Sequence, residues 1–288
     1  MILSSIVQVE DKLKNFLKEE FGLSSRIITR LRKEKYVYVN GKYRYMDYLL
    51  SPGDEVKVRL DFDINTFPRE KIEIDVVYED DALIVVNKDP NITVHPTKGT
   101  PSGTLLNALG HYAYEKGEDY KIRFANRLDK DTSGLIIIAK NKYIDHLLSK
   151  QFVERSPEKF YLALVEGNCP LEFSFEGKMG RLGEEFKRSI IPEGKDSLTY
   201  FRTLNSDGKI SLISAKPITG RTHQIRLHLS ELGYPILGDE LYGYSGNIKR
   251  TMLHCERMII IHPLSGKRLE LYAPLKLDMK EALEALDE

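Results

Sequence analysis

The first clear hydrophobic pattern in the chain is a helical one near the N-terminus. Leu13, Phe16 and Leu17 recur at positions i, i+3 and i+4 and leave lysines on the opposite side. This spacing predicts an amphipathic helix over residues 11–19. The segment Ser24-Ser25-Arg26 then supplies an N-cap for a second helix. That helix carries four basic residues, namely Arg26, Arg30, Arg32 and Lys33.

Alternating positions follow the second helix and predict strands. Val37-Tyr38-Val39 alternates between apolar and polar positions, and Asn40-Gly41 directly after it is a hairpin turn signal. Residues 51–54, Ser-Pro-Gly-Asp, are a second turn signal, and a strand pattern over residues 55–60 follows them. The N-terminal part of the chain is therefore expected to combine two helices with a small sheet.

The domain organisation follows from chain length and from a break in the pattern. At 288 residues the chain is long for one compact domain and comfortable for two. Residues 61–69 lack periodicity and contain Pro68, which is typical of a linker. We expect a small domain over residues 1–62, a linker over 63–72 and a larger domain over 73–288.

Strand and helix patterns intermix irregularly in the larger domain. Residues 142–152 have the period of an amphipathic helix. Five short apolar or alternating stretches predict strands, at residues 74–78, 83–87, 135–139, 160–165 and 209–215. The lack of regular strand–helix alternation argues against a doubly wound nucleotide-binding domain. The pattern favours an α+β fold with a mixed, largely antiparallel sheet and flanking helices.

Composition limits the location and the chemistry of the protein. Charges from Glu10 onward interrupt the apolar N-terminal run, so we expect a cytoplasmic protein without membrane contact. Cys169 and Cys255 are the only cysteines, and their separation favours reduced thiols over a disulfide framework or a structural metal site. The 43 basic and 43 acidic residues cancel, which argues against nucleic-acid binding by bulk charge. Residues 1–60 nevertheless hold 12 Lys and Arg against 8 Asp and Glu.

The N-terminal elements, taken together with their residues, resemble the S4 RNA-binding module. The shared features are the serine-arginine helix start, the Val-x-Val-Asn-Gly turn at residues 37–41 and the Gly-Asp-x-Val turn at residues 53–56. The resemblance covers roughly residues 10–62 and implies a small α/β domain that binds structured RNA. The RNA contacts that it implies come from the second helix, through Ser25, Arg26, Arg30 and Lys33. The alternative interpretation is a basic helix face that is merely solvated.

A carboxylate with basic neighbours, Asp129, stands shortly before a strongly apolar strand. Arg127 and Lys130 hold it ionised, which suits a nucleophile, whereas the alternative is a surface ion pair in a loop. The surrounding string resembles the catalytic signature of the RluA/RluD-like pseudouridine synthases, His-Arg-Leu-Asp-x-x-Thr-Ser-Gly before an apolar run. The chain departs from this signature at Asn126, where the family usually has His. The resemblance implies that Asp129 is the nucleophile.

The stretch from Lys159 to Gly167 resembles the second motif of this family, Lys-x-Tyr-x-Ala-x-Val-x-Gly. It reads as a strand with Tyr161, Ala163 and Val165 on one face, and an aromatic residue at such a position is most often part of a core. The family resemblance implies a different role. By this resemblance, Tyr161 packs under the target base and takes part in proton transfer.

A third string, from Gly220 to Arg226, resembles the least ambiguous motif of the family, Gly-Arg-Thr-His-Gln-Ile-Arg. We expect Thr222 to cap a helix whose apolar residues leave His223 and His228 outside the core. Two histidines five residues apart without a partner carboxylate are a poor metal pair. The resemblance implies that Arg226 pairs with the catalytic Asp. It also implies rim and RNA contacts from Arg221, His223 and Gln224.

A weaker match lies at residues 86–96, which resemble the family's Asn-Lys-Pro-x-Gly segment. Asp89 and Asn91 stand at the usual Pro and Gly positions. Asparagine tolerates the positive φ that the glycine supplies, so we expect Asn91 to keep the turn. In total the family resemblance spans about residues 73–275.

The resemblance implies an enzyme that isomerises uridines of structured RNA, with ribosomal RNA favoured over tRNA. This reaction needs neither metal nor nucleotide cofactor, and the sequence has no P-loop or clustered Cys/His site. A flipped uridine would stack on Tyr161, while Arg127 fills the space it leaves or holds a phosphate. We expect a monomer. Two alternatives are a catalytically silent S4-type RNA-binding or ribosome-associated factor and a glycoside hydrolase with a second carboxylate.

Overall fold

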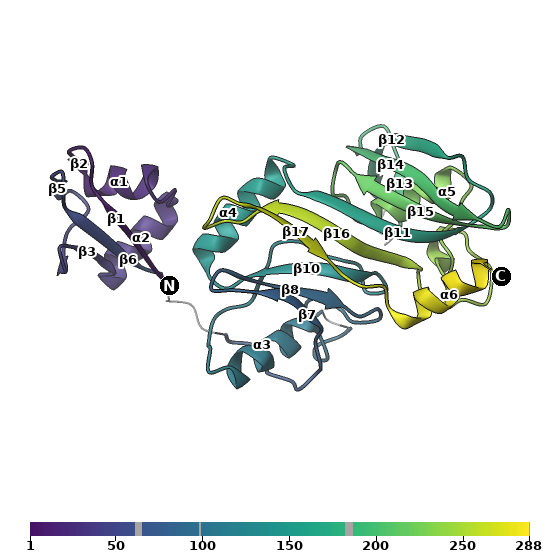
Figure 1. Cartoon of the computed structure of the whole chain (residues 1–288), viewed down its shortest axis with the longest axis horizontal. Coiled ribbons are helices and arrows are strands. Elements are labelled where there is room, and N and C mark those ends of the chain that lie inside the picture. Colours follow the sequence, from purple (N-terminus) through teal and green to yellow (C-terminus); the bar gives the residue numbers. More distant parts are fainter. Residues whose placement is uncertain (61–64, 98, 182–186, 288) are drawn as a thin grey trace.

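The computed structural model describes residues 1–60, 65–97, 99–181 and 187–287. Its N-terminal part is a small sheet with two helices (Figure 1). The sheet has the antiparallel order β1-β6-β3-β4, and β2 pairs separately with β5. The elements are β1 (Ile2–Ile6), β2 (Asp11–Lys12), α1 (Leu13–Glu19), α2 (Ser25–Glu34), β3 (Val37–Val39), β4 (Lys42–Tyr43), β5 (Leu49–Leu50) and β6 (Glu55–Arg59).

Apolar side chains of both helices and of one sheet face form the core of this part. They are Leu13, Leu17, Ile27, Leu31, Val37, Val39, Val56 and Val58. The expected cap of α2 is confirmed, because Ser24 Oγ accepts a hydrogen bond from the Ile27 amide at 3.4 Å. The expected hairpin turn is confirmed as well. Asn40 and Gly41 have φ values of 49° and 76°, and such positive values are the ones that a two-residue turn of this kind requires.

The segment expected to be a linker, residues 63–72, begins in residues 61–64, which lie outside the described part of the chain. From Asn65 onward this segment lies against α3 of the larger domain. Arg69 pairs with Asp119 at 3.2 Å, and its guanidinium lies 4.4 Å from the ring centroid of Tyr114. The second half of the expected linker therefore has a fixed place on α3.

The larger domain is built on one sheet of eleven described strands (Figure 1). The main path has the order β13-β12-β14-β15-β11-β16-β10-β8-β7, with β17 beside β16 and β9 beside β10. The strands are β7 (Val76–Glu79), β8 (Leu83–Lys88), β9 (Arg123–Phe124), β10 (Ser133–Ala139), β11 (Glu158–Glu166), β12 (Glu172–Arg181), β13 (Arg188–Ile190), β14 (Lys195–Ser206), β15 (Ile210–Pro217), β16 (Leu253–Ile261) and β17 (Arg268–Tyr272). The helices are α3 (Leu105–Glu115), α4 (Lys142–Val153), α5 (Gln224–Glu231), the short 3-10 helix η1 (Glu240–Tyr242) and α6 (Leu277–Asp287).

A short parallel contact between β10 and β16 joins the two halves of this sheet. It consists of the pairs Ser133–His254 and Gly134–Cys255, whereas the other described strand pairs are antiparallel. Strands β7 and β8 continue the sheet on the β10 side, and β11, β15, β14 and β12 continue it on the β16 side. The expected α+β fold with a mixed, largely antiparallel sheet is confirmed.

Several elements of the fold had no clear signal in the sequence. The hairpin of β12 and β14 is the largest of them, with paired residues from Glu172–Arg202 to Met179–Lys195. Most side chains of β12 are exposed or half-buried, so its hydrophobic pattern is weak. Pairing with β14 supplies the order that the pattern of β12 alone did not predict.

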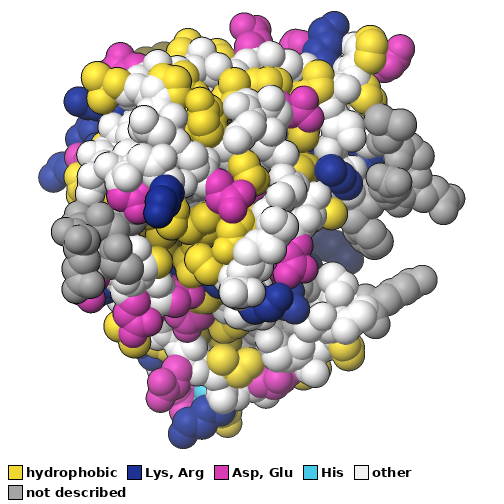
Figure 2. Space-filling model, turned by 90° about the vertical axis from the view of Figure 1, so that its right-hand side faces the viewer, with side chains coloured by type: hydrophobic (Ala, Val, Ile, Leu, Met, Phe, Trp, Pro, Cys, Tyr) yellow, Lys and Arg dark blue, Asp and Glu magenta, His cyan; other side chains and the backbone are white. Residues whose placement is uncertain are grey.

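The surface carries charges of both signs. Figure 2 shows the face at the right-hand end of Figure 1, where basic, acidic and hydrophobic side chains are interspersed without a large field of one sign. This distribution agrees with the net charge of zero. Within the described residues, no helix is both long enough and apolar enough to span a membrane.

The β10–β16 contact leaves no room for a side chain at Gly134. This glycine has φ 109°, and a Cβ atom there would lie 2.3 Å from the Cys255 carbonyl oxygen. We expect Gly134→Ala to lower the free energy of unfolding by at least about 3 kcal/mol. The cost of the positive φ for alanine adds to the cost of the steric overlap between Cβ and the Cys255 backbone. Gly208→Ala is the matched control. It also has positive φ (88°) but meets no atom within 4 Å, so it should cost only about 1–2 kcal/mol. Urea unfolding of both variants measures the difference, and equal losses would contradict the role of the contact.

Candidate active site

The main cleft of the larger domain lies where the two halves of the sheet meet. Its volume is about 710 Å³. Residues from segments 93–97, 126–132, 152–161 and 217–226 line it. The residues that the sequence motifs single out in this domain all belong to this lining: Arg127, Asp129, Tyr161, Arg221, His223, Gln224 and Arg226. The fold therefore brings three motifs that are far apart in the chain into one cavity.

Asp129 lies in the loop that leads into β10, with its side chain 29 % exposed. Its carbonyl accepts a hydrogen bond from the Thr132 amide at 3.2 Å, which closes the loop. Asn126, which stands where the family signature usually has His, attaches this loop to the sheet. The Asn126 side chain accepts from the Ile137 amide at 2.8 Å and donates to the Leu135 carbonyl at 3.1 Å. The asparagine amide thus pairs with β10 much as a neighbouring strand would.

Arg226 joins Asp129 to a second carboxylate, Asp239. Its Nη1 lies 3.3 Å from Asp129 Oδ2, while its Nε and Nη2 donate to Asp239 at 2.6 and 2.7 Å. Asp239 is 1 % exposed. Burial alone would lower the pKa of Arg226, but hydrogen bonds to Asp239 and the charges of both carboxylates raise it above its usual range. The bidentate contact fixes the guanidinium plane and leaves one N–H directed at Asp129.

The start of α5 differs from its prediction. Thr222 does not cap the helix, because α5 begins at Gln224 and the N-cap position belongs to His223, whose φ is 59°. His228 is not left outside the core. It is fully buried, hydrogen-bonded to Ser197 and Thr199, and burial lowers its pKa to about 4.

Gln224, which was expected to make rim and RNA contacts, has its side chain turned toward the protein interior. It is buried, and its side-chain oxygen accepts from Thr219 Oγ1 at 2.7 Å and from the Arg221 amide at 3.0 Å. Its Nε2 donates to the Leu198 carbonyl and to Thr199 Oγ1. These bonds hold the turn that carries Arg221, so Gln224 supports the rim from within.

His223 faces Asp129 from the other side of the cleft floor. Its Nε2 lies 3.8 Å from Asp129 Oδ2, and its Nδ1 lies 3.0 Å from the hydroxyl of Tyr242. That hydroxyl oxygen accepts from the Arg188 amide, so its own proton is available for Nδ1. Burial lowers the pKa of His223, although Asp129 opposes this effect. The neutral ring then carries its proton on Nε2, toward Asp129.

Tyr161 reaches the cleft from β11, the strand beside β16. The pairing register of β11 with β16 shifts between Phe160 and Tyr161, an irregularity that redirects side chains along a strand. Tyr161 is 8 % exposed and hydrogen-bonds Cys255. Burial, together with Cys255, raises the pKa of the Tyr161 hydroxyl well above its ordinary value of 10. The phenol therefore stays protonated at neutral pH.

A buried lysine, Lys88, supports the Asp129 loop from below. It is 2 % exposed, and its Nζ donates to the carbonyls of Asp89, Ile92 and Lys130 at 2.7, 3.0 and 2.8 Å. Burial lowers the pKa of Lys88 to about 7, although the charge of Asp131 opposes this shift. The expected positive φ at Asn91, in the same turn, is confirmed at 64°.

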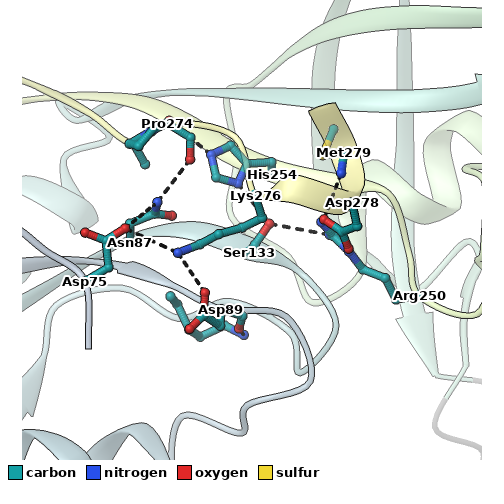
Figure 3. Close-up of polar contacts among 12 residues, drawn as sticks. Asp75, Asn87, Asp89, Ser133, Arg250, His254, Pro274, Lys276, Asp278 and Met279 are labelled. Atoms are coloured by element: carbon teal, nitrogen blue, oxygen red, sulfur yellow. Dashed lines mark hydrogen bonds and ion pairs between the residues drawn. The ribbon is translucent and has the colours of Figure 1, made fainter. Parts of the chain in front are cut away.

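The C-terminal segment holds the same loop from behind. Figure 3 shows Arg250 between Ser133 of β10 and Asp278 of α6. Its guanidinium donates to both carboxylate oxygens of Asp278 at 2.6 and 2.8 Å and lies 3.4 Å from Ser133 Oγ. Ser133 Oγ also pairs with His254 Nδ1 at 2.8 Å. Lys276, at the start of this segment, pairs with Asp89 at 2.7 Å. Helix α6 and the Asp129 loop are thus parts of one polar network.

The four residues of α2 that were expected to contact RNA do not lie in this cleft. Ser25, Arg26 and Lys33 are exposed on α2 and Arg30 is half-buried, and none of them lines the cavity. Arg26, Arg30 and Lys33 follow the i, i+4, i+7 spacing of one helical face. Among the described residues, no group of three His, Cys, Asp or Glu side chains is placed to hold a metal ion.

Sequence reasoning missed Asp239, Lys88 and Arg250 as parts of the site. Asp239 directly follows an apolar run at residues 235–238, and Lys88 follows the run at residues 83–86 after one intervening residue, Asn87. A charged residue at the end of a buried run is a usable signal, because such a residue needs a partner. Arg250 has no such signal, since its partner Asp278 lies 28 positions further along.

The low pKa of Lys88 predicts a specific dependence of stability on pH. Between about pH 7 and pH 10 the unfolded chain binds a proton at this lysine that the folded chain does not, so stability rises with pH. From pH 7 to about pH 9, the wild type should gain about 2 kcal/mol relative to Lys88→Met. Urea unfolding at the two pH values tests this. Parallel pH dependence in both proteins would show that Lys88 is ionised in the fold.

Comparison with known proteins agrees with this geometry. A family model for RNA pseudouridylate synthase matches residues 82–231. The chain is 31 % identical over 271 residues to the uncharacterized RNA pseudouridine synthase YjbO of Bacillus subtilis, covering 92 % of this chain and 96 % of that protein. It is 33 % identical over 253 residues to ribosomal large subunit pseudouridine synthase D of Haemophilus influenzae, covering 81 % and 78 %.

Solved structures show the same fold. The human RNA pseudouridylate synthase domain containing 1 superposes with a TM-score of 0.61 at 27 % identity, covering 76 % of this chain and 97 % of that one. The matched family region contains the Asp129 loop, Tyr161 and the α5 motif with Arg226. The chain therefore belongs to the RNA pseudouridylate synthase family, as an enzyme of the RluA/RluD-like type.

Proposed function

We propose that this RNA pseudouridine synthase acts on ribosomal RNA, with Asp129 as its nucleophile. The observation that carries the assignment is the contact of Asp129 with Arg226, which is itself held by the buried Asp239. The isomerisation breaks the N1–C1′ bond of uridine and forms a C5–C1′ bond. Attack at C1′, addition at C6 and removal of the 2′ proton all need a carboxylate beside the sugar or base, and Arg226 holds an N–H next to the Asp129 carboxylate.

Tyr161 forms the floor on which the flipped base stacks. Its ring lines the cavity and its hydroxyl keeps its proton. In the free enzyme Tyr161 therefore offers an aromatic surface and a hydrogen-bond donor. The cavity volume of about 710 Å³ is in the range of pockets that enclose small ligands. Stacking on Tyr161 would offset part of the cost of unstacking the uridine, a few kcal/mol.

The rim of the cleft supplies cations for the RNA backbone. Arg127 is exposed directly beside the nucleophile's loop, and Arg221 is half-buried with its Nε bound to the Asp196 carbonyl. In this proposal Arg127 occupies the space that the flipped base leaves, or holds a flanking phosphate. Arg221 and His223 contact the RNA around the opening.

Ribosomal RNA is the favoured substrate for two reasons. Relatives named ribosomal large subunit pseudouridine synthase D and C, from Haemophilus influenzae and Vibrio cholerae, are 33 % and 32 % identical to the chain. The basic surplus of residues 1–60 and the exposed cations of α2 also fit an S4-like domain that docks on a structured RNA. In this proposal residues 1–62 form that domain, and residues 73–288 carry the chemistry.

A catalytically silent RNA-binding factor is the alternative function, and the cleft argues against it. A chain that only bound RNA would have no need for Asp129, Tyr161 and Arg226 together in one cavity. A buried Arg–Asp pair is also costly to keep without a role, because apolar residues of similar volume are often as stable.

Asp129→Asn should abolish isomerisation and preserve RNA binding. Asparagine keeps the shape of the side chain but cannot act as a nucleophile, so tritium release from [5-³H]uridine RNA should fall by roughly 1,000-fold or more. The control is Asp81→Asn, an exposed carboxylate in the turn between β7 and β8, which should match the wild type. Normal release by Asp129→Asn would disprove the assignment.

Asp239→Asn tests whether the second carboxylate positions Arg226. We expect kcat to fall roughly 10- to 100-fold with little change in KM, because the guanidinium loses its fixed plane while the RNA contacts remain. The free energy of unfolding should fall by about 3 kcal/mol, since a buried charge loses its partner. Glu240→Gln, at the next position and largely exposed, is the matched control. A rise in KM at constant kcat would instead assign Asp239 to RNA binding.

A further inference from the structure

The N-terminal sheet has one face that its helices do not cover. Val37, Val39, Val56 and Val58 point toward α1 and α2, so the alternate residues point away from them. On β1 the outward positions Ile2 and Ile6 are 67 % and 49 % exposed. This open side of the order β1-β6-β3-β4 is called the outer sheet face below.

Tyrosines gather on the outer sheet face. Tyr38 of β3 stands opposite Tyr43 of β4 in the pairing register, so the two side chains share a face. Tyr45, two residues further on and 69 % exposed, meets Tyr43 edge to face, with ring centroids 5.4 Å apart. Tyr36 precedes β3 on the same side. Four rings thus lie along neighbouring positions of one small surface.

Cations lie between and beside these rings. Lys57 of β6 stands directly opposite Tyr38, and its side chain is 46 % exposed. Its ion pair with Glu55 is solvent-exposed and therefore weak. The guanidinium of Arg59 lies 5.1 Å from the ring centroid of Tyr36. Across the ladder, the outer sheet face therefore has Ser4, Lys57, Tyr38 and Tyr43 in this order.

We propose that the outer sheet face binds unpaired nucleotides of the RNA substrate by stacking their bases on Tyr45, Tyr43 and Tyr38, with Lys57 on the backbone phosphates. The proposal rests on the proposed function only in taking the substrate to be RNA. Exposed rings on a sheet next to cations are the chemistry that binds single strands, because every base has a π-face. A duplex hides its bases and does not fit this surface.

This surface is separate from the basic face of α2. The cations Arg26, Arg30 and Lys33 lie on a helix that packs on the opposite side of the sheet. They suit the phosphates of a folded RNA. The outer sheet face would instead hold an unpaired segment that leaves the folded part, so the small domain would recognise a junction between paired and unpaired RNA.

The test measures binding of a fluorescein-labelled short oligouridine to the full-length protein by fluorescence anisotropy. Tyr45→Leu should weaken binding about tenfold, and Tyr45→Phe should stay within about twofold of the wild type, because phenylalanine keeps the stacking ring. Tyr200→Leu is the control. Tyr200 is also an exposed tyrosine, at 51 %, but lies on β14 of the larger domain, so this variant should bind like the wild type. Equal loss in the Phe and Leu variants, or wild-type binding by Tyr45→Leu, would overturn the proposal.

Salt dependence gives a second readout for the cation. Lys57→Gln should reduce the slope of log binding constant against log salt concentration by about 0.7, the contribution of one phosphate contact on a single strand. An unchanged slope would remove Lys57 from the surface. Thermal unfolding of each variant shows whether the small domain stays folded. As a ligand control, Tyr45→Leu and the wild type should bind a blunt duplex of the same length with equal affinity.

The outcomes separate this surface from the catalytic proposal. If the wild type releases tritium but Tyr45→Leu binds oligouridine normally, the outer sheet face fails and the proposed function stands. If Asp129→Asn remains active while Tyr45→Leu loses oligouridine binding, the catalytic assignment fails and the binding surface stands.

Discussion

The buried pairing of Arg226 with Asp239 is the constraint on which the rest of the site depends. A guanidinium at this depth needs a full charge partner, and removing one partner of such a pair typically costs about 3–5 kcal/mol. Asp239 fills that need with two short hydrogen bonds. Since both of its bonds lie along one edge of the guanidinium, Nη1 stays free of Asp239 and is directed at Asp129. The position of the guanidinium beside Asp129 is therefore set by Asp239, a buried residue that does not line the cleft.

The sheet junction explains why the cleft forms where it does. Strands β10 and β16 pair over only two positions, and further along they pair instead with β9 and β17. The Asp129 loop enters β10 at this point, and Tyr161 of β11 hydrogen-bonds Cys255 of β16 across it. Lys88 and Arg250 then bind the carbonyls of the loop from two sides. A loop held this way can present a carboxylate at a fixed angle, which is what alignment with a reacting bond requires.

Much of the site was predictable because short motifs carry local geometry. The positive φ at Asn91 and at Asn40 follows from asparagine's tolerance of that conformation, and both hold in the fold. The contact of Arg226 with Asp129 was likewise expected from the family motif and is present. Gln224 and His228 differ from their predictions, because both side chains are buried in the core. Their helix has buried residues all round its first two turns, so the polar side chains there bond to strand β14.

The sequence by itself determined which motifs line the cleft, where helices α2 and α4 and several apolar strands lie, and which family the chain resembles. These are properties of short segments, where side-chain period and turn preference act over a few residues. Only the tertiary structure decided how the segments meet. The partner choice of Arg226, the cradle of carbonyls around Lys88 and the tie from Arg250 to Asp278 all join distant positions. A buried charged group is costly without a partner, so these contacts form where the fold brings two such groups together. No local sequence pattern specifies which two groups meet.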